Sequence, residues 1–234
     1  MSNTFIIGVS HIRSFANDLF TCIFLGSGSN LNLHKGFQKL NNEIDVFIKK
    51  KLYTDKDIVI LQIGEESVRY ILRNEFYPHK LDPKQWNEVY KNDIKTLNSV
   101  SGKKEIDVLV ERYIQLINKI KEQIPNLFIL SSITSFSPIN DAVIYFNKKV
   151  EDYYNGERYI NIFPTILKNI DKYLNYKFKY ETQHSGYENF DFDPIHLGNN
   201  CNRLLIDILS KKYELIFKDV GLKKSNKFKN CYLL

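Results

Sequence analysis

A serine near the N-terminus and an aspartate and a histidine near the C-terminus could together catalyse the transfer of an acyl group. Ser10 follows a short apolar run near the N-terminus, and Asp193 precedes His196 by three residues near the C-terminus. A serine hydroxyl becomes a nucleophile when an imidazole accepts its proton, and a carboxylate can orient that imidazole and stabilise its charge. We therefore interpret Ser10 as a candidate nucleophile, His196 as its base and Asp193 as the residue that orients the base.

Acyl transfer also needs hydrogen-bond donors for the oxyanion that forms on the attacked carbonyl. Ser10 is expected to begin a helix, so its own backbone N–H can point at that oxygen. Gly26 follows the apolar run 22–25, and it has no side chain to block a second donor. We expect the amides of Ser10 and Gly26 to form the oxyanion hole. This mechanism needs no metal and no organic cofactor, and we expect none.

Further charged residues lie beside these candidates. Glu65 and Arg69 follow the apolar segment 57–64, and His11 follows Ser10 directly. We assign His11, Glu65 and Arg69 to the substrate side of the site. Arg69 could bind an anionic substrate group such as a sugar carboxylate, or it could form a salt bridge with Glu65 or Glu66. His11 could be a substrate contact or a structural contact.

Competing interpretations exist for the same residues. Ser10 could be a helix N-cap, because serine is favoured there, and His196 could be a surface histidine. His184 is a second candidate base, although no carboxylate stands three residues before it. The glycines of the loop 26–28 also suggest a nucleotide or S-adenosylmethionine site, but the dinucleotide fingerprint needs a third glycine where Leu31 stands.

The elements that must position these residues follow from the hydrophobic pattern. Short apolar runs predict strands, and apolar residues at spacings of three and four predict helices. The predicted strands are 5–9, 22–25, 57–64, 127–130 and 159–162, and the predicted helices are 40–52, 106–124, 142–153 and 201–217, with one or two helical turns between 13 and 19. This alternation predicts one α/β domain over 1–234 with a parallel sheet and a basic tail at about 222–234. Reactive groups of such sheets gather at the carboxyl ends of the strands.

The order of the short blocks resembles the SGNH/GDSL serine hydrolase family. Gly8-Val9-Ser10 stands where that family has Gly-Asp-Ser, Gly26 stands at its second-block glycine, and residues 64–67 stand at its Gly-x-Asn-Asp block. The segment 193–196 fits its Asp-x-x-His block. The resemblance implies a flavodoxin-like three-layer α/β/α sandwich. The phrases 10–15 and 64–69 look closer to a branch often linked to surface polysaccharide metabolism. The resemblance therefore implies an esterase or O-acyltransferase that acts on a small acyl group, such as acetyl, of a carbohydrate.

Two positions depart from the family pattern. Val9 replaces the aspartate before the serine, and Glu66 falls where the family has an oxyanion-binding asparagine. An ionised carboxylate cannot donate a hydrogen bond and would repel an oxyanion, so Glu66 must point away or be held neutral, or else the oxyanion hole has one donor fewer. Loss of one such donor typically costs about 3 kcal/mol. The alternatives are therefore a weakly active or inactive glycan-binding or assembly module, and a glycosyl- or methyl-transfer enzyme that uses the Gly26 loop.

Composition excludes several classes of protein. The chain of 234 residues has 33 Lys and Arg against 27 Asp and Glu, a formal net charge of +6. The lysines are scattered along helical stretches, so we expect a solvated basic surface and no nucleic-acid partner. No apolar run approaches the ~20 residues that span a bilayer, and the first residues do not resemble a signal peptide. Three widely spaced cysteines indicate a reducing compartment. We expect a cytoplasmic protein, not bound to a membrane, whose substrate is a carbohydrate or an acylated small molecule; the oligomeric state stays open.

Overall fold

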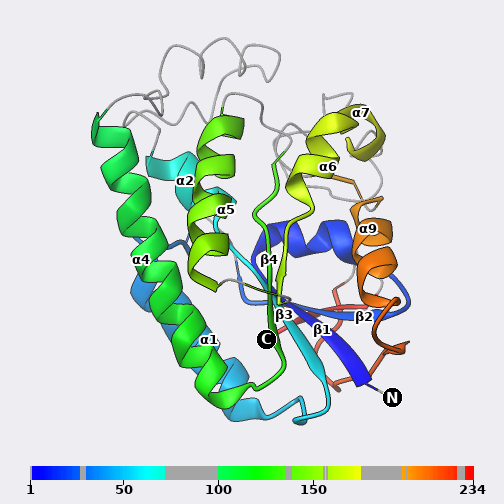
Figure 1. The fold of residues 1–234 in the computed structure, drawn as a ribbon. Coiled ribbons are helices and arrows are strands. Elements are labelled where there is room, and N and C mark those ends of the chain that lie inside the picture. The colour runs from blue at the N-terminus through cyan, green and yellow to red at the C-terminus, as the bar shows by residue number, and fades with distance from the viewer. Residues whose placement is uncertain are drawn as a thin grey trace.

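Parallel strands form one sheet at the centre of the molecule in this computed structural model (Figure 1). The structure describes residues 2–26, 30–71, 100–134, 139–154, 156, 158–174, 197–198, 200–225 and 230–234. Within these residues the sheet has seven strands, all paired in parallel. They are β1 (Ser2–Gly8), β2 (Phe20–Phe24), β3 (Ile58–Gln62), β4 (Leu127–Leu130), β5 (Tyr159–Ile160), β6 (Leu215–Ile216) and β7 (Cys231–Leu233).

The order of the strands places a switch point at the middle of the sheet. The order is β5-β4-β3-β1-β2-β7, and β6 pairs with the first two residues of β1. The chain therefore goes from β1 to β2 on one side and then crosses back to β3 on the other side of β1. This is a doubly wound arrangement, in which ligands bind outside the carboxyl ends of the strands where the order reverses.

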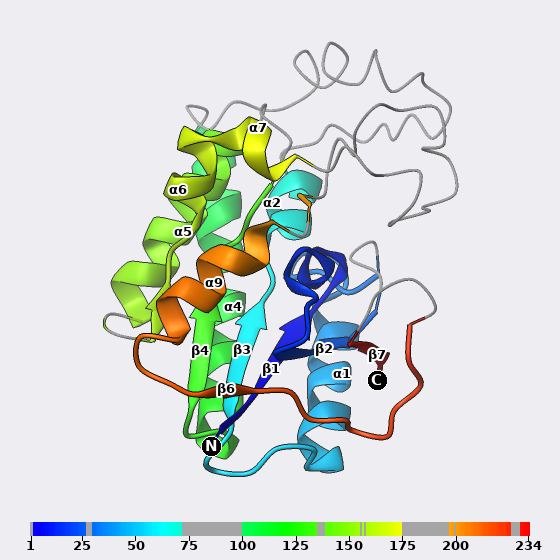
Figure 2. The same cartoon turned by 90° about the vertical axis from the view of Figure 1, so that its right-hand side faces the viewer.

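Helices cover both faces of the sheet, as expected for parallel strands that are buried on both sides. The helices between the described strands are η1 (Ser10–Phe15), α1 (Phe37–Lys50), α2 (Glu65–Ile71), α4 (Val100–Gln123), α5 (Asn140–Tyr154), α6 (Phe163–Lys168), α7 (Ile170–Tyr173) and α9 (Cys201–Leu209). In Figure 2, α9 lies in front of the sheet and α1 and α4 lie behind it. The α/β class, the parallel sheet and the helical layers are therefore confirmed. Among the described helices, none carries an apolar stretch long enough to cross a membrane.

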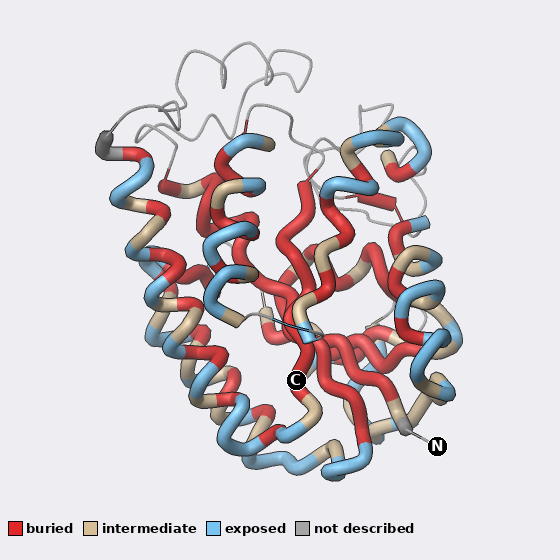
Figure 3. Tube along the Cα trace, viewed as in Figure 1, coloured by how far each residue is buried: buried red, intermediate tan, exposed pale blue. Residues whose placement is uncertain are grey.

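The central strands form the core because their side chains are apolar on both faces. Figure 3 shows β3 and β4 buried along their length and β1 buried except at its start, whereas the helices expose one side to solvent. All five residues of β3 and all four of β4 are buried. β1 and β3 pair in register, so Gly8 lies opposite Gln62 at their carboxyl ends. The segments that follow these two strands therefore leave the sheet side by side.

The last part of the chain differs from the pattern predicted for it. The helix predicted over 201–217 ends at Leu209, and Leu215–Ile216 form strand β6 instead. The apolar spacing continues through Tyr213 and Ile216, but the first residues of β1 offer an edge that β2 does not pair, and Leu215 and Ile216 pair with it. The tail also contains a strand: β7 pairs with β2, and Tyr232 is fully buried.

A side chain at position 8 should destabilise the sheet. A Cβ at Gly8 would stand 2.1 Å from the Gln62 carbonyl oxygen, a backbone atom that the central strand holds in place. We expect Gly8→Ala to lower the free energy of unfolding by about 2 kcal/mol or more, measured by urea denaturation. Gly221→Ala is the control, because space is open there and only its positive φ of 65° adds strain, a cost of about 1 kcal/mol. Equal losses in the two variants would contradict the tight approach of β1 and β3.

Candidate functional site

The candidate site lies at the carboxyl ends of β1 and β3, on either side of the switch point. Helix η1 begins at Ser10, two residues after β1, and α2 begins at Glu65, three residues after β3. The turn between β3 and α2 is sharp and requires glycine at position 64. The φ of Gly64 is +133°, and a Cβ there would stand 2.4 Å from Ser132 Oγ. The edge predicted from the strand pattern therefore brings His11, Glu65 and Glu66 together.

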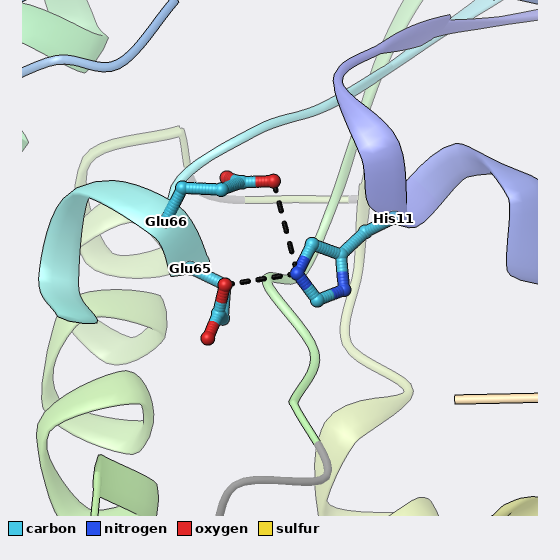
Figure 4. A group of neighbouring side chains, drawn as sticks. All are labelled: His11, Glu65 and Glu66. Carbon is cyan, nitrogen blue, oxygen red and sulfur yellow. Dashed lines mark hydrogen bonds and ion pairs between the residues drawn. The ribbon is translucent and has the colours of Figure 1, made fainter. Parts of the chain in front are cut away.

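A buried hydrogen bond joins the two helices. His11 Nε2 lies 2.8 Å from Glu65 Oε2, and both side chains are fully buried (Figure 4). Since an ionised carboxylate only accepts hydrogen bonds, the imidazole Nε2–H is the donor. The contact spans 54 residues of sequence and ties the helix after β1 to the helix after β3.

Glu65 has two further partners. Arg69, one helical turn later in α2, donates from Nε to Glu65 Oε1 at 3.0 Å, and Thr134 donates from its hydroxyl to the same oxygen at 3.3 Å. Burial raises the pKa of Glu65 most strongly, but the charges and hydrogen bonds of Arg69 and His11 outweigh it, so the pKa is lowered. Glu65 is therefore held as a carboxylate by the guanidinium of Arg69 and the imidazole of His11.

Glu66 approaches the same imidazole without a hydrogen bond. Its Oε1 lies 3.7 Å from His11 Nε2, and no hydrogen-bond partner for that oxygen is found among the described residues (Figure 4). Burial raises the pKa of Glu66, and the charge of Glu65 adds to the rise although His11 opposes it. For His11, burial lowers the pKa, but the charges of Glu65 and Glu66 outweigh it and the pKa is raised. The environment therefore favours a charged His11 and disfavours a charged Glu66.

Among the described residues, His11, Glu65 and Glu66 form a group that could hold a metal ion. Each of His11, Glu65 and Glu66 offers one ligand atom, and these atoms lie within 4.8 Å of one another. Imidazole and carboxylate oxygens are ordinary ligands of divalent metals. However, Arg69 already supplies a positive charge to Glu65, and the 2.8 Å contact with His11 is a hydrogen-bond distance. These three side chains are therefore better suited to sharing a proton than to binding a metal ion, which would be a second cation beside Arg69.

Ser10 and Gly26 lie along the same edge of the sheet. Ser10 is half-buried at the start of η1, as expected, and Gly26 comes two residues after β2, the neighbour of β1. Gly26 has a φ of +150°, and a Cβ there would stand 2.6 Å from Leu31 Cδ1. The position therefore requires glycine.

The other two residues of the predicted triad, Asp193 and His196, lie outside the described residues, and so does the competing base His184. Leu197, which follows His196 in the sequence, is described. Its carbonyl oxygen accepts a hydrogen bond of 2.6 Å from the hydroxyl of Ser14, in η1, and both residues are buried. The chain just after the Asp-x-x-His segment is therefore attached to the helix that begins at Ser10.

The structure decides the role of one predicted residue and adds two residues that the sequence analysis does not name. Arg69 was considered as a substrate contact or a salt-bridge partner; it is buried and paired with Glu65, and the spacing of four residues in a helix was the signal for that pair. Thr134 is not among the predicted site residues, although it stands in the segment directly after β4. Ser67 was also missed: its hydroxyl oxygen accepts a hydrogen bond from the backbone N–H of Leu33, in the loop after β2.

Removal of the Glu65 charge should destabilise the fold. Glu65→Gln leaves the Arg69 guanidinium and the His11 imidazole buried without their anion, and breaking a buried ion pair in this way costs about 3–5 kcal/mol. We expect this loss in the free energy of unfolding measured by urea denaturation. Asp107→Asn is the control, because it breaks an exposed ion pair with Lys149 and should leave stability almost unchanged. A Glu65→Gln variant as stable as the control would contradict an ionic role for this contact.

The contribution of His11 to stability should depend on pH. Because the folded-state pKa of His11 is raised above its ordinary value of 6.5, its contribution is complete below 6.5 and is lost as the pH rises through the raised pKa. Glu65 has a lowered pKa, so its contribution is present above 4.5 and is lost as the pH falls through the lowered pKa. The difference in unfolding free energy between the wild type and His11→Gln should therefore shrink from mildly acid to alkaline pH. A difference that stays constant or grows would show that His11 is neutral in the folded protein.

Comparisons of the sequence with protein families and with curated proteins identify no family for this chain. Neither a scan against models of protein families nor a search of curated proteins gave a match to the chain. The case for a function consequently depends on the residues at the carboxyl edge of the sheet and on the order of the short sequence blocks around them.

Proposed function

We propose that the chain is a serine-dependent acyl-ester hydrolase or O-acyltransferase built on an SGNH hydrolase-like domain. One observation carries the proposal: Ser10 begins a helix at the switch point, and the segment after Asp193-x-x-His196 is hydrogen-bonded to that same helix through Leu197. Ser10 and Leu197, the residue after the predicted Asp-x-x-His segment, thus belong or attach to one short element, although they are nearly two hundred residues apart in the sequence. The order of the strands also supports the proposal, because it puts Ser10 where doubly wound proteins bind ligands.

The proposed reaction begins with attack of Ser10 Oγ on the ester carbonyl. His196 accepts the hydroxyl proton and later donates it to the departing alcohol, and Asp193 orients the imidazole. Water or a sugar hydroxyl then attacks the acyl-enzyme, and this acceptor determines whether the outcome is hydrolysis or transfer. The proposed substrate is an acylated carbohydrate with a small acyl group such as acetyl, in accordance with the resemblance of the sequence blocks.

The proposed oxyanion hole consists of the backbone N–H groups of Ser10 and Gly26. Both residues follow neighbouring strands, β1 and β2, whose register pairs Gly8 with Phe24. Glu66 stands at the asparagine position of the family, but its carboxyl group is directed at His11 (Figure 4). In this proposal Glu66 is not an oxyanion donor, and its raised pKa limits the negative charge that it would bring near the reaction.

The buried position of His11, Glu65 and Arg69 supports a positioning role for these residues. The His11 and Glu65 side chains have no exposed surface, and Arg69 is 7% exposed. We propose that they hold η1, and with it Ser10, against α2. This replaces direct substrate contact as their proposed part in the site.

A second candidate is a glycan-binding or assembly module on the same fold. The direction of Glu66 favours it, because the family's third oxyanion donor is then missing and a reaction would be slower by about a hundredfold or more. Val9 has a hydrocarbon side chain that is fully buried, and so it offers no polar group where the family has an aspartate. The two candidates differ in whether Ser10 is nucleophilic.

Labelling by a fluorophosphonate tests whether Ser10 is a nucleophile, because this probe reacts with activated serines. We expect one phosphonylated residue per chain, identified as Ser10 by peptide mass spectrometry, and no labelling of Ser10→Ala. Ser210→Ala is the control: it removes an exposed hydroxyl at the end of α9 and should be labelled like the wild type. Absence of labelling of the folded wild type from neutral to alkaline pH would favour the binding module.

A further inference from the structure

Two of the three cysteines of the chain stand opposite each other in the sheet. Cys22 lies in β2 and Cys231 lies in β7, and the register of these two parallel strands pairs them directly. Residues paired in this way point to the same face of a sheet, because the pleats of neighbouring strands are aligned. Both are free thiols and both are buried. They come from opposite ends of the sequence, so the fold alone brings them together.

The spacing of the two cysteines suits a disulfide. Neighbouring strands lie about 4.7–4.9 Å apart, and a disulfide usually joins residues whose Cα atoms are about 4.4–6.8 Å apart. The side chains also interact with each other. A hydrogen bond with Cys231 raises the pKa of the Cys22 thiol more than burial does. Cys201 differs, since burial is the cause of its raised pKa. The pair in the sheet is therefore within reach of bond formation.

Strand β7 is short and lies at one end of the described strand order. It has three residues, and β2 is its neighbour in the sheet (Figure 2). Next to it, the backbone N–H of Cys22 donates to the carbonyl of Asn230, and the N–H of Leu233 donates to the carbonyl of Lys223. A strand held by so few contacts opens locally at a lower cost than the centre of a sheet. Local opening of β7 therefore exposes Cys231 without unfolding the rest of the domain.

Strand β7 protects an apolar edge of the sheet. The first four residues of β2 are buried, and β1 pairs with the other side of that strand. Without β7, the backbone groups on the outer side of β2 would be open to pairing with another chain, a known route to aggregation. A covalent link between β7 and β2 would keep this edge closed.

We propose that Cys22 and Cys231 are a redox-sensitive pair, and that their oxidation to a disulfide locks β7 onto β2. The oxidant is a small-molecule disulfide, such as oxidised glutathione. When β7 opens, the Cys231 thiolate attacks this disulfide, so that a mixed disulfide forms and one glutathione thiol leaves. The Cys22 thiolate then attacks the Cys231 sulfur and displaces the second glutathione thiol. The protein thiols thus lose two protons and two electrons, and the glutathione disulfide gains them.

The inference goes beyond the proposed function and does not depend on it. Neither cysteine belongs to the predicted triad or to the proposed oxyanion hole. In a reducing compartment the pair remains a dithiol, and β7 is held by its non-covalent contacts. Oxidising conditions add the covalent lock. Failure of the serine chemistry would leave this inference unchanged, and the reverse is also true.

Oxidation of the folded full chain tests the pair. The wild type is incubated with oxidised glutathione in the absence of denaturant, and its remaining thiols are alkylated in urea and counted by mass spectrometry. We expect the count to fall from three to one, with the last thiol at Cys201 and a peptide map that links Cys22 to Cys231. Dithiothreitol should restore all three thiols. Three thiols after oxidation, a lasting glutathione adduct, or a link to Cys201 or to a second chain overturns the proposal.

The lock should also change the stability of the chain. The oxidised wild type should unfold at a urea midpoint about 1 M higher than the reduced form, because a cross-link restricts the unfolded chain. Hydrogen exchange at the backbone amides of β7 should slow in the same sample, since the strand no longer opens. A disulfide that forms without either change overturns the lock.

Variants of the three cysteines separate the pair from general oxidation. Cys201→Ala is the matched control, because it removes a buried thiol from α9, outside the pair. It should oxidise and gain stability as the wild type does. Cys22→Ala and Cys231→Ala should form no protein disulfide and show no shift of the midpoint on oxidation. A shift that persists in either variant contradicts the pairing. If these variants do not fold, the oxidised and reduced wild type decide the question.

Discussion

The arrangement of the candidate site depends on one buried contact, the hydrogen bond from His11 Nε2 to Glu65 Oε2. It joins the segments that leave β1 and β3, the two strands on either side of the switch point, in an interior where electrostatic interactions are stronger than in water. Arg69 makes the contact stable, because it balances the charge of Glu65. Removal of Glu65 would leave the Arg69 guanidinium and the His11 imidazole buried without the anion that they share.

This contact also determines what η1 presents to solvent. His11 is held inward by Glu65, and Ser14 is held inward by the carbonyl of Leu197. With three residues per turn, the fixed inner positions leave Ser10 and Arg13 on the outer face. A short 3-10 helix has little stability of its own, so the side-chain contacts on its buried face supply the rigidity that a reactive serine needs.

The two positions at which the sequence departs from the SGNH pattern that it resembles are both buried. Val9 is buried in the core at the end of β1, and Glu66 faces a histidine that already has a carboxylate partner. Two carboxyl groups beside one imidazole can hold a proton among them, which agrees with the raised pKa of Glu66. The site thus contains a buried charged network, where the family has polar residues that serve the oxyanion.

The sequence by itself determined the α/β class, the central strands and the edge at which the site lies. Continuous apolar runs such as 57–64 are recognisable because a parallel strand is buried on both faces, and the glycines that end them indicate close turns. Only the tertiary structure decided the short strands β6 and β7, since two or three residues carry no periodic signal and pair with β1 and β2 from the far end of the chain. The contact of His11 with Glu65 was decided in the same way, because a buried contact between distant segments depends on strand register and helix direction, which local residue patterns do not encode.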